Sequence, residues 1–114
     1  MRKVFFIFIT ILLVLCVNSY AHPPSEMRLS YNSDTKILRV EIKHQVINPK
    51  THYVKRVVVK LQDRVIFTHN IKEQSDRFAQ VFEYAVLNAK FSDVITVTAY
   101  CNQGGTITEE LSVF

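Results

Sequence analysis

The sequence predicts an all-β fold, an antiparallel β-sandwich of immunoglobulin-like architecture with about seven short strands. Apolar and polar residues alternate with a period of two along almost the whole chain after residue 21, as they do in half-buried strands. The apolar positions are mostly β-branched or aromatic, and no stretch has the spacing of a convincing amphipathic helix. These observations together favour two packed sheets over a helical or mixed fold.

The first half of this region contains four predicted strands. Their inward-facing positions are, in order, Met27, Leu29 and Tyr31; Leu38, Val40 and Ile42; Val57, Val59 and Leu61; and the stretch 65–68. The second strand has Arg39 and Glu41 at its intervening positions, and the third has Arg56 and Lys60 on its other face, as expected for a solvent-facing side. Asn32-Ser33-Asp34 supplies the first turn, and the short link 62–64 joins the third strand to the fourth.

Three more strands follow a polar loop at 70–77. Their inward-facing positions begin with Phe82, Tyr84 and Val86, continue with Ile95, Val97 and Ala99, and end in the stretch 107–113 after Gly104-Gly105. His44 and Cys101 continue the inward-facing parity of the strands that precede them. We therefore expect both side chains on the buried side of the sandwich, or at its rim.

Residues 1–21 have the three parts of a secretory signal peptide. Arg2 and Lys3 form the charged start, residues 4–17 form an apolar run, and Ser19-Tyr20-Ala21 forms a cleavage motif. The apolar run is shorter than the roughly 20 residues that a bilayer-spanning helix needs, which disfavours a membrane anchor. We expect an exported protein, periplasmic or secreted, with one domain at 22–114 and no membrane contact after cleavage.

Composition excludes several classes of function. The whole chain has a net charge of +4, but without Arg2 and Lys3 twelve Lys and Arg stand against ten Asp and Glu. The basic residues alternate with apolar ones instead of forming a patch, so a nucleic-acid partner is excluded. Gly104 and Gly105 are the chain's two glycines, which excludes a glycine-rich phosphate loop.

The cysteine and two of the histidines suggest a metal site. Because Cys16 belongs to the signal peptide, Cys101 would remain as an unpaired thiol in an oxidising compartment. His44 and His52 bracket the loop HQVINPKTH, close enough for both imidazoles to reach one point. Imidazole and thiolate are good ligands for iron, copper and zinc, whereas solvated loop histidines and a buried cysteine need no metal. Spacing alone leaves both interpretations open.

Three stretches, HQVINPKTHYV, KRVVVKLQDRV and ITVTAYCN, add a resemblance to a known family. In order and strand context they resemble the iron-binding domain of superoxide reductases, the desulfoferrodoxin and neelaredoxin family, across residues 22–114. The resemblance implies a mononuclear non-haem iron centre that reduces superoxide to peroxide with electrons from a donor protein. It implies four metal ligands in this chain, His22, His44, His52 and the axial thiolate of Cys101, with Tyr53 and Asn102 positioning them.

Three departures from the family pattern argue that this activity is weakened or lost. The family's last histidine stands three residues after the cysteine, where this chain has Gly104. The family has a lysine before its first histidine, and this chain has Ala21 before His22. The family also has a proline after its second histidine, and this chain has Gln45 after His44. One alternative is a non-catalytic metal-binding or interaction sandwich; another is a copper site in which His22, as the mature N-terminus, binds through its amine and imidazole. Exposed edge strands also allow a homo-oligomer.

Overall fold

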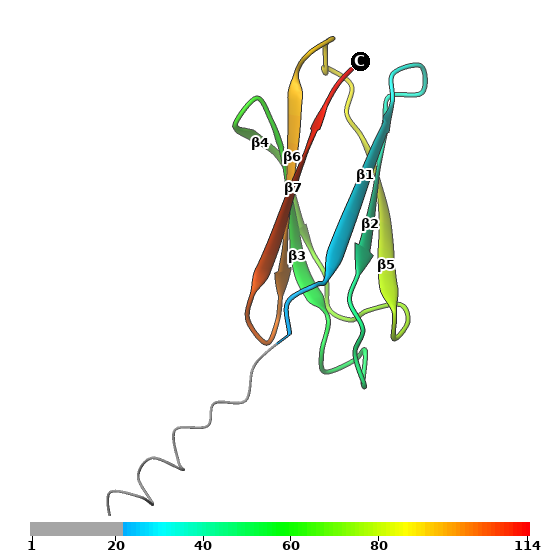
Figure 1. Ribbon diagram of the computed structural model, residues 1–114, viewed down its shortest axis with the longest axis vertical. Coiled ribbons are helices and arrows are strands. Elements are labelled where there is room, and N and C mark those ends of the chain that lie inside the picture. Colours follow the sequence, from blue (N-terminus) through cyan, green and yellow to red (C-terminus); the bar gives the residue numbers. More distant parts are fainter. Residues whose placement is uncertain (1–21) are drawn as a thin grey trace, which may run out of the picture.

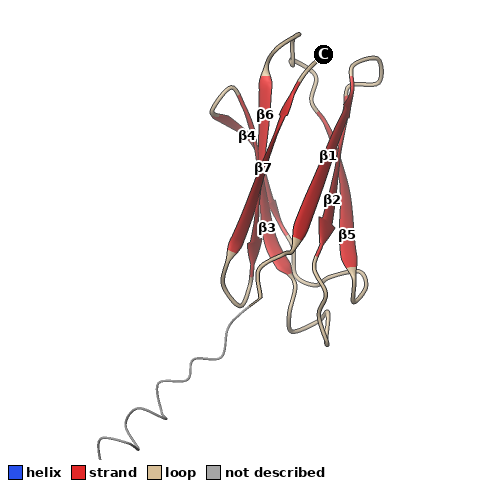
Figure 2. Ribbon diagram, in the orientation of Figure 1, coloured by secondary structure: helices blue, strands red, loops and turns tan. Residues whose placement is uncertain are grey.

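In the computed structural model, residues 22–114 are described, and the predicted signal peptide at 1–21 lies outside the described residues. The described region contains seven strands and no helix, arranged as two facing sheets (Figures 1 and 2). The strands are β1 (Glu26–Asn32), β2 (Ile37–Lys43), β3 (Val54–Leu61), β4 (Arg64–Asn70), β5 (Ala79–Ala85), β6 (Val94–Cys101) and β7 (Thr106–Ser112). The predicted all-β sandwich is confirmed. Within these residues, accordingly, no helix is long and apolar enough to cross a membrane.

The two sheets contain three and four strands, and every strand pair is antiparallel. One sheet has the order β1-β2-β5 and the other the order β4-β3-β6-β7. The chain passes from one sheet to the other after β2, after β4 and after β5. Loops 44–53, 71–78 and 102–105 therefore meet residues 22–25 at one end of the sandwich, the lower end in Figure 1.

The core lies between the sheets, on the faces that the alternation predicts. Eight aliphatic side chains from three central strands are fully buried: Leu38, Val40 and Ile42 on β2, Val57 and Val59 on β3, and Ile95, Val97 and Ala99 on β6. Burying each larger one of these contributes about 1.5–3 kcal/mol to folding. This core holds β2, β3 and β6 rigidly, and the candidate metal ligands lie at the ends of these three strands.

Several strands extend further than the alternation predicts. β3 begins at Val54 and β6 runs to Cys101, because Val54 and Cys101 are themselves paired across the two strands. β4 continues to Asn70, whose partner on β3 is Arg56. Backbone pairing does not require apolar side chains, so strands continue into polar positions that the pattern excludes.

Two-residue and four-residue turns close the hairpins. Gln62 and Asp63 both have positive φ angles, 51° and 62°, which is the geometry of a type I′ turn between β3 and β4. At the β1–β2 turn, the Asn32 side-chain oxygen accepts hydrogen bonds from the backbone N–H groups of Asp34 and Thr35. These turns lie at the opposite end of the sandwich from loops 44–53 and 102–105.

Candidate metal centre

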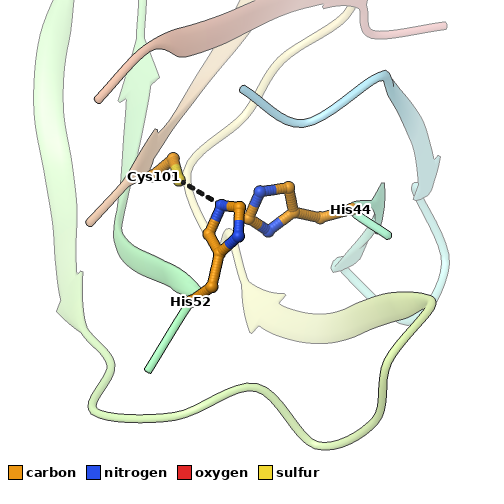
Figure 3. Close-up of side chains that lie close together, drawn as sticks. All are labelled: His44, His52 and Cys101. Atoms are coloured by element: carbon orange, nitrogen blue, oxygen red, sulfur yellow. Dashed lines mark hydrogen bonds between the residues drawn. The ribbon is translucent and has the colours of Figure 1, made fainter. Parts of the chain in front are cut away.

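His44, His52 and Cys101 come together at the loop end of the sandwich (Figure 3). His44 directly follows β2, His52 precedes β3 by two residues, and Cys101 is the last residue of β6. One ligand atom from each residue lies within 4.8 Å of the other two. This group could hold a metal ion.

The distances within the group suit a single ion. His52 Nε2 is 3.1 Å from Cys101 Sγ, and the two imidazole rings meet edge to face with centroids 4.7 Å apart. Ligand atoms on one tetrahedral ion are separated by about 3.5 Å when metal–nitrogen bonds are about 2.0 Å and metal–sulfur bonds about 2.3 Å. Small rotations of the side chains would therefore bring all three atoms to one ion.

Two of the three side chains are almost completely buried, as their strand parity predicts. His44 is 1% exposed and Cys101 is 2% exposed, whereas His52 is half-buried. Burial lowers the pKa of His52 below the usual range for histidine, and the neighbouring His44 ring lowers it further, although the His22 backbone opposes both effects. His52 is thereby biased toward the neutral imidazole, the form that binds metals.

His44 makes a hydrogen-bonding contact from each ring nitrogen. Nδ1 lies 2.9 Å from Gln74 Oε1, and Nε2 lies 3.0 Å from the backbone oxygen of His22. Both partners are oxygen acceptors, so a proton on Nδ1 satisfies the first contact, while a proton or a cation at Nε2 satisfies the second. Nδ1 is thus held by an oxygen partner, as in a ligand histidine, and Nε2 would bind a metal where the cation takes the place of a proton facing the His22 oxygen.

Asn102 fastens the His52 loop to the end of β6. Its side-chain oxygen accepts a hydrogen bond from the Tyr53 N–H at 2.9 Å, and its side-chain nitrogen donates to the Thr51 carbonyl at 2.9 Å. The Asn102 backbone N–H also donates to the Tyr53 carbonyl. Asn102 therefore bonds the residues on both sides of His52, which agrees with its predicted positioning role.

His22 contacts the site through its backbone and not through its imidazole. Its backbone oxygen contacts His44, while its side chain is exposed and is not part of the group of three. Pro23 packs on the turn after Cys101: a Cβ added at Gly105 would lie 2.7 Å from Pro23 Cβ. This close approach keeps the start of the domain over the candidate site.

Two further residues bear on the number of ligands, Gly104 and His69. Gly104, where the family has its last histidine, has a φ angle of 109° in the turn between β6 and β7. His69 lies on β4, where Nδ1 contacts the Tyr84 hydroxyl at 2.8 Å and the ring packs edge-on against Phe82. It is half-buried in an aromatic cluster, and it is not part of the group of three.

Gln74 is the residue of this site that sequence reasoning misses. It is 3% exposed, yet it lies in loop 71–78, where no alternation of polar and apolar residues gives its orientation. The stretch IKEQSDRF reads as a solvated polar loop, and nothing in it distinguishes Gln74 from its neighbours. Its role becomes visible only when the loop is folded against His44.

Comparison with known proteins adds no relative to this description. No family model, no curated protein and no solved structure matches the chain. The resemblance of its short motifs to the superoxide reductases therefore enters the functional argument as a proposal.

Proposed function

We propose that residues 22–114 form a metal-binding domain that holds one redox-active transition-metal ion between His44, His52 and Cys101. The observation that carries this proposal is the convergence of two imidazoles and a thiol within 4.8 Å from three separate parts of the chain. Both His44 and Cys101 are almost completely buried at the ends of core strands, which supports the proposal because the core then fixes where their donor atoms lie.

Mononuclear non-haem iron is the metal that the family resemblance favours. Two imidazoles and a thiolate suit iron, and a thiolate donates electron density to the metal. Superoxide would take one electron from ferrous iron and two protons, giving hydrogen peroxide, and a donor protein would return an electron to the ferric ion. Since Gly104 supplies no fourth imidazole, we expect this superoxide reductase-like activity to be weak or absent.

Copper is the second candidate, and the place of His22 favours it. Its carbonyl oxygen lies 3.0 Å from His44 Nε2, so the start of the domain reaches the site. If export removes residues 1–21, the new amine belongs to the same residue and could bind together with its imidazole. Copper also binds nitrogen and sulfur ligands more tightly than iron does. In either case the protein acts outside the cytoplasm.

The test is metal content, with the mature N-terminus read by mass spectrometry in protein purified from its exporting host. Anaerobic loading with ferrous iron followed by oxidation should give one iron per chain and a visible thiolate-to-ferric charge-transfer band. Cys101→Ser should abolish the band and His52→Asn should weaken binding, while His69→Gln serves as the histidine control.

Three results are distinguishable. Iron with the charge-transfer band supports the superoxide reductase-like centre, and copper with His22 at the terminus supports the amine-containing site. No metal in the purified protein, together with no binding at micromolar iron, copper or zinc, overturns the proposal and leaves an interaction module. A band that survives Cys101→Ser overturns the assignment of the thiolate.

A further inference from the structure

Gln74 is held by three separate contacts on the inner side of its loop. Its backbone N–H donates to the Pro49 carbonyl at 2.9 Å, in the loop that carries His44 and His52. Its side-chain Nε2 donates to the His44 carbonyl at 2.7 Å and to the Asp76 carbonyl at 2.9 Å. Both the backbone and the side-chain amide of Gln74 are therefore held in place by hydrogen bonds.

These contacts determine which way the amide faces. A carbonyl oxygen only accepts hydrogen bonds, so the nitrogen of the Gln74 amide must face His44 O and Asp76 O. The opposite orientation would place Oε1 against two other oxygens and leave both without a donor. Oε1 consequently faces His44 Nδ1, at 2.9 Å.

The orientation of the amide in turn determines the tautomer of His44. Because Oε1 has no proton to give, the 2.9 Å contact is a hydrogen bond only when Nδ1 carries the proton. The nitrogen left for a metal is then Nε2, where the bound cation takes the place that a proton would fill in the 3.0 Å contact with the His22 carbonyl oxygen. We propose that Gln74 is a positioning residue that fixes His44 as the Nδ1–H tautomer and thereby makes Nε2 its metal-binding atom.

This inference rests on the proposed function for its metal, but its first half concerns the metal-free chain. Partners of this kind hold a ligand ring in one orientation, and their loss typically costs roughly 10- to 100-fold in metal affinity. We expect a loss of that size for Gln74→Met, which keeps the length of the side chain and removes both its donor and its acceptor.

Gln80 offers a matched control. It is a second buried glutamine, 4% exposed, on the strand that follows the same loop, and its Nε2 donates to the Glu73 carbonyl at 3.3 Å. It makes no hydrogen bond to His44. Gln80→Met should therefore leave both the tautomer of His44 and the metal affinity within about twofold of the parent protein, since no partner of a ligand is removed.

The test uses nitrogen-15 NMR of the histidine rings, with Zn²⁺ as a diamagnetic probe. Metal-free parent protein should show His44 protonated at Nδ1, and the Zn²⁺ form should show binding through Nε2. Gln74→Met should give a mixture of tautomers and the loss in Zn²⁺ affinity. Gln74→Glu, which keeps an acceptor, should retain the Nδ1–H tautomer where the chain still folds.

Each outcome decides the question. His44 bound through Nδ1, or a metal-free ring protonated at Nε2 alone, overturns the inference in the parent protein, with no variant needed. An unchanged tautomer and affinity in folded Gln74→Met also overturns it. If the parent binds none of zinc, iron and copper, the proposed function fails, while the metal-free spectrum still decides the tautomer.

Discussion

His52 Nε2 lies 3.1 Å from Cys101 Sγ although 49 residues separate them in the sequence. The contact follows from the pairing of β3 with β6, in which Val54 is opposite Cys101. This register brings the loop before β3 to the end of β6, where Asn102 bonds both neighbours of His52. The sheet sets the approximate position of the two ligands, and the Asn102 side chain sets their separation.

Asn102→Ala should therefore loosen the site more than it unfolds the protein. It removes two side-chain hydrogen bonds, each worth about 0.5–1.5 kcal/mol, so we expect the free energy of unfolding to fall by about 1–3 kcal/mol. Metal affinity should fall as well, because His52 is no longer held beside Cys101. Urea unfolding and metal titration measure the two effects.

Gln103→Ala is the matched control for Asn102→Ala. Gln103 is exposed, and its side chain makes one 3.2 Å hydrogen bond, to the same Thr51 carbonyl that Asn102 uses. Its loss should lower the free energy of unfolding by less than about 0.5 kcal/mol and leave metal affinity unchanged. Equal effects of the two substitutions would show that Asn102 has no special role.

Stability should depend on pH through His52. Its pKa is lowered in the folded protein, so above about pH 6.5 both folded and unfolded states hold it neutral and the protein is at full stability. Below that pH the unfolded chain gains a proton that the folded chain resists. As the pH is lowered below about 6.5, the free energy of unfolding should decrease until the pH passes the pKa of His52 in the folded protein.

Urea unfolding of metal-free protein at pH 7.5, 6.5 and 5.5 measures this dependence. In His52→Asn the slope over this range should be shallower than in the parent, because one histidine that takes up a proton on unfolding is gone. A slope identical in the two proteins would contradict a lowered pKa at His52.

Strand parity placed His44 and Cys101 correctly, because both continue an alternation whose inner face is buried between sheets. Strand parity does not predict side-chain orientation in the loops, because the backbone there does not alternate regularly between two faces. Gln74 and the His22 carbonyl therefore come to His44 without a sequence signal. His69 lies in a stretch, FTHN, that carries no motif, and only its place on β4 shows that it packs against Phe82 and Tyr84.

The His69–Tyr84 contact should contribute to stability without affecting the metal. Burial raises the pKa of Tyr84 well above its usual range, so the hydroxyl stays protonated and can donate to His69 Nδ1 at 2.8 Å. His69→Phe keeps the aromatic packing and leaves the hydroxyl without this partner. We expect a loss of about 1–2 kcal/mol in the free energy of unfolding.

Tyr84→Phe combined with His69→Phe completes this test. Because the double variant leaves no unpaired hydroxyl, it should be less destabilised than the sum of the two single variants. All three proteins should bind metal as the parent does. Loss of metal in His69→Phe would instead place His69 among the ligands.

Gly104→His tests whether the missing histidine of the family pattern can be restored by one substitution. We expect that it cannot. Gly104 has a φ angle of 109°, a region that residues with a Cβ rarely adopt, and the neighbouring Gly105 has a φ angle of 86°. The turn after Cys101 is thus built for two glycines, and its backbone does not suit a residue that carries an imidazole.

Gly104→His should lower the free energy of unfolding by about 1–3 kcal/mol, the usual cost of a strained backbone conformation. Superoxide reduction by iron-loaded protein should not rise above that of the parent. Gly104→Ala is the control: it introduces the same backbone strain without an imidazole, so it separates the effect of strain from any effect of the added ring. If Gly104→His is as stable as the parent and reduces superoxide faster, then the turn does accept the fourth ligand, and the absence of this histidine alone accounts for the weak activity that we expect.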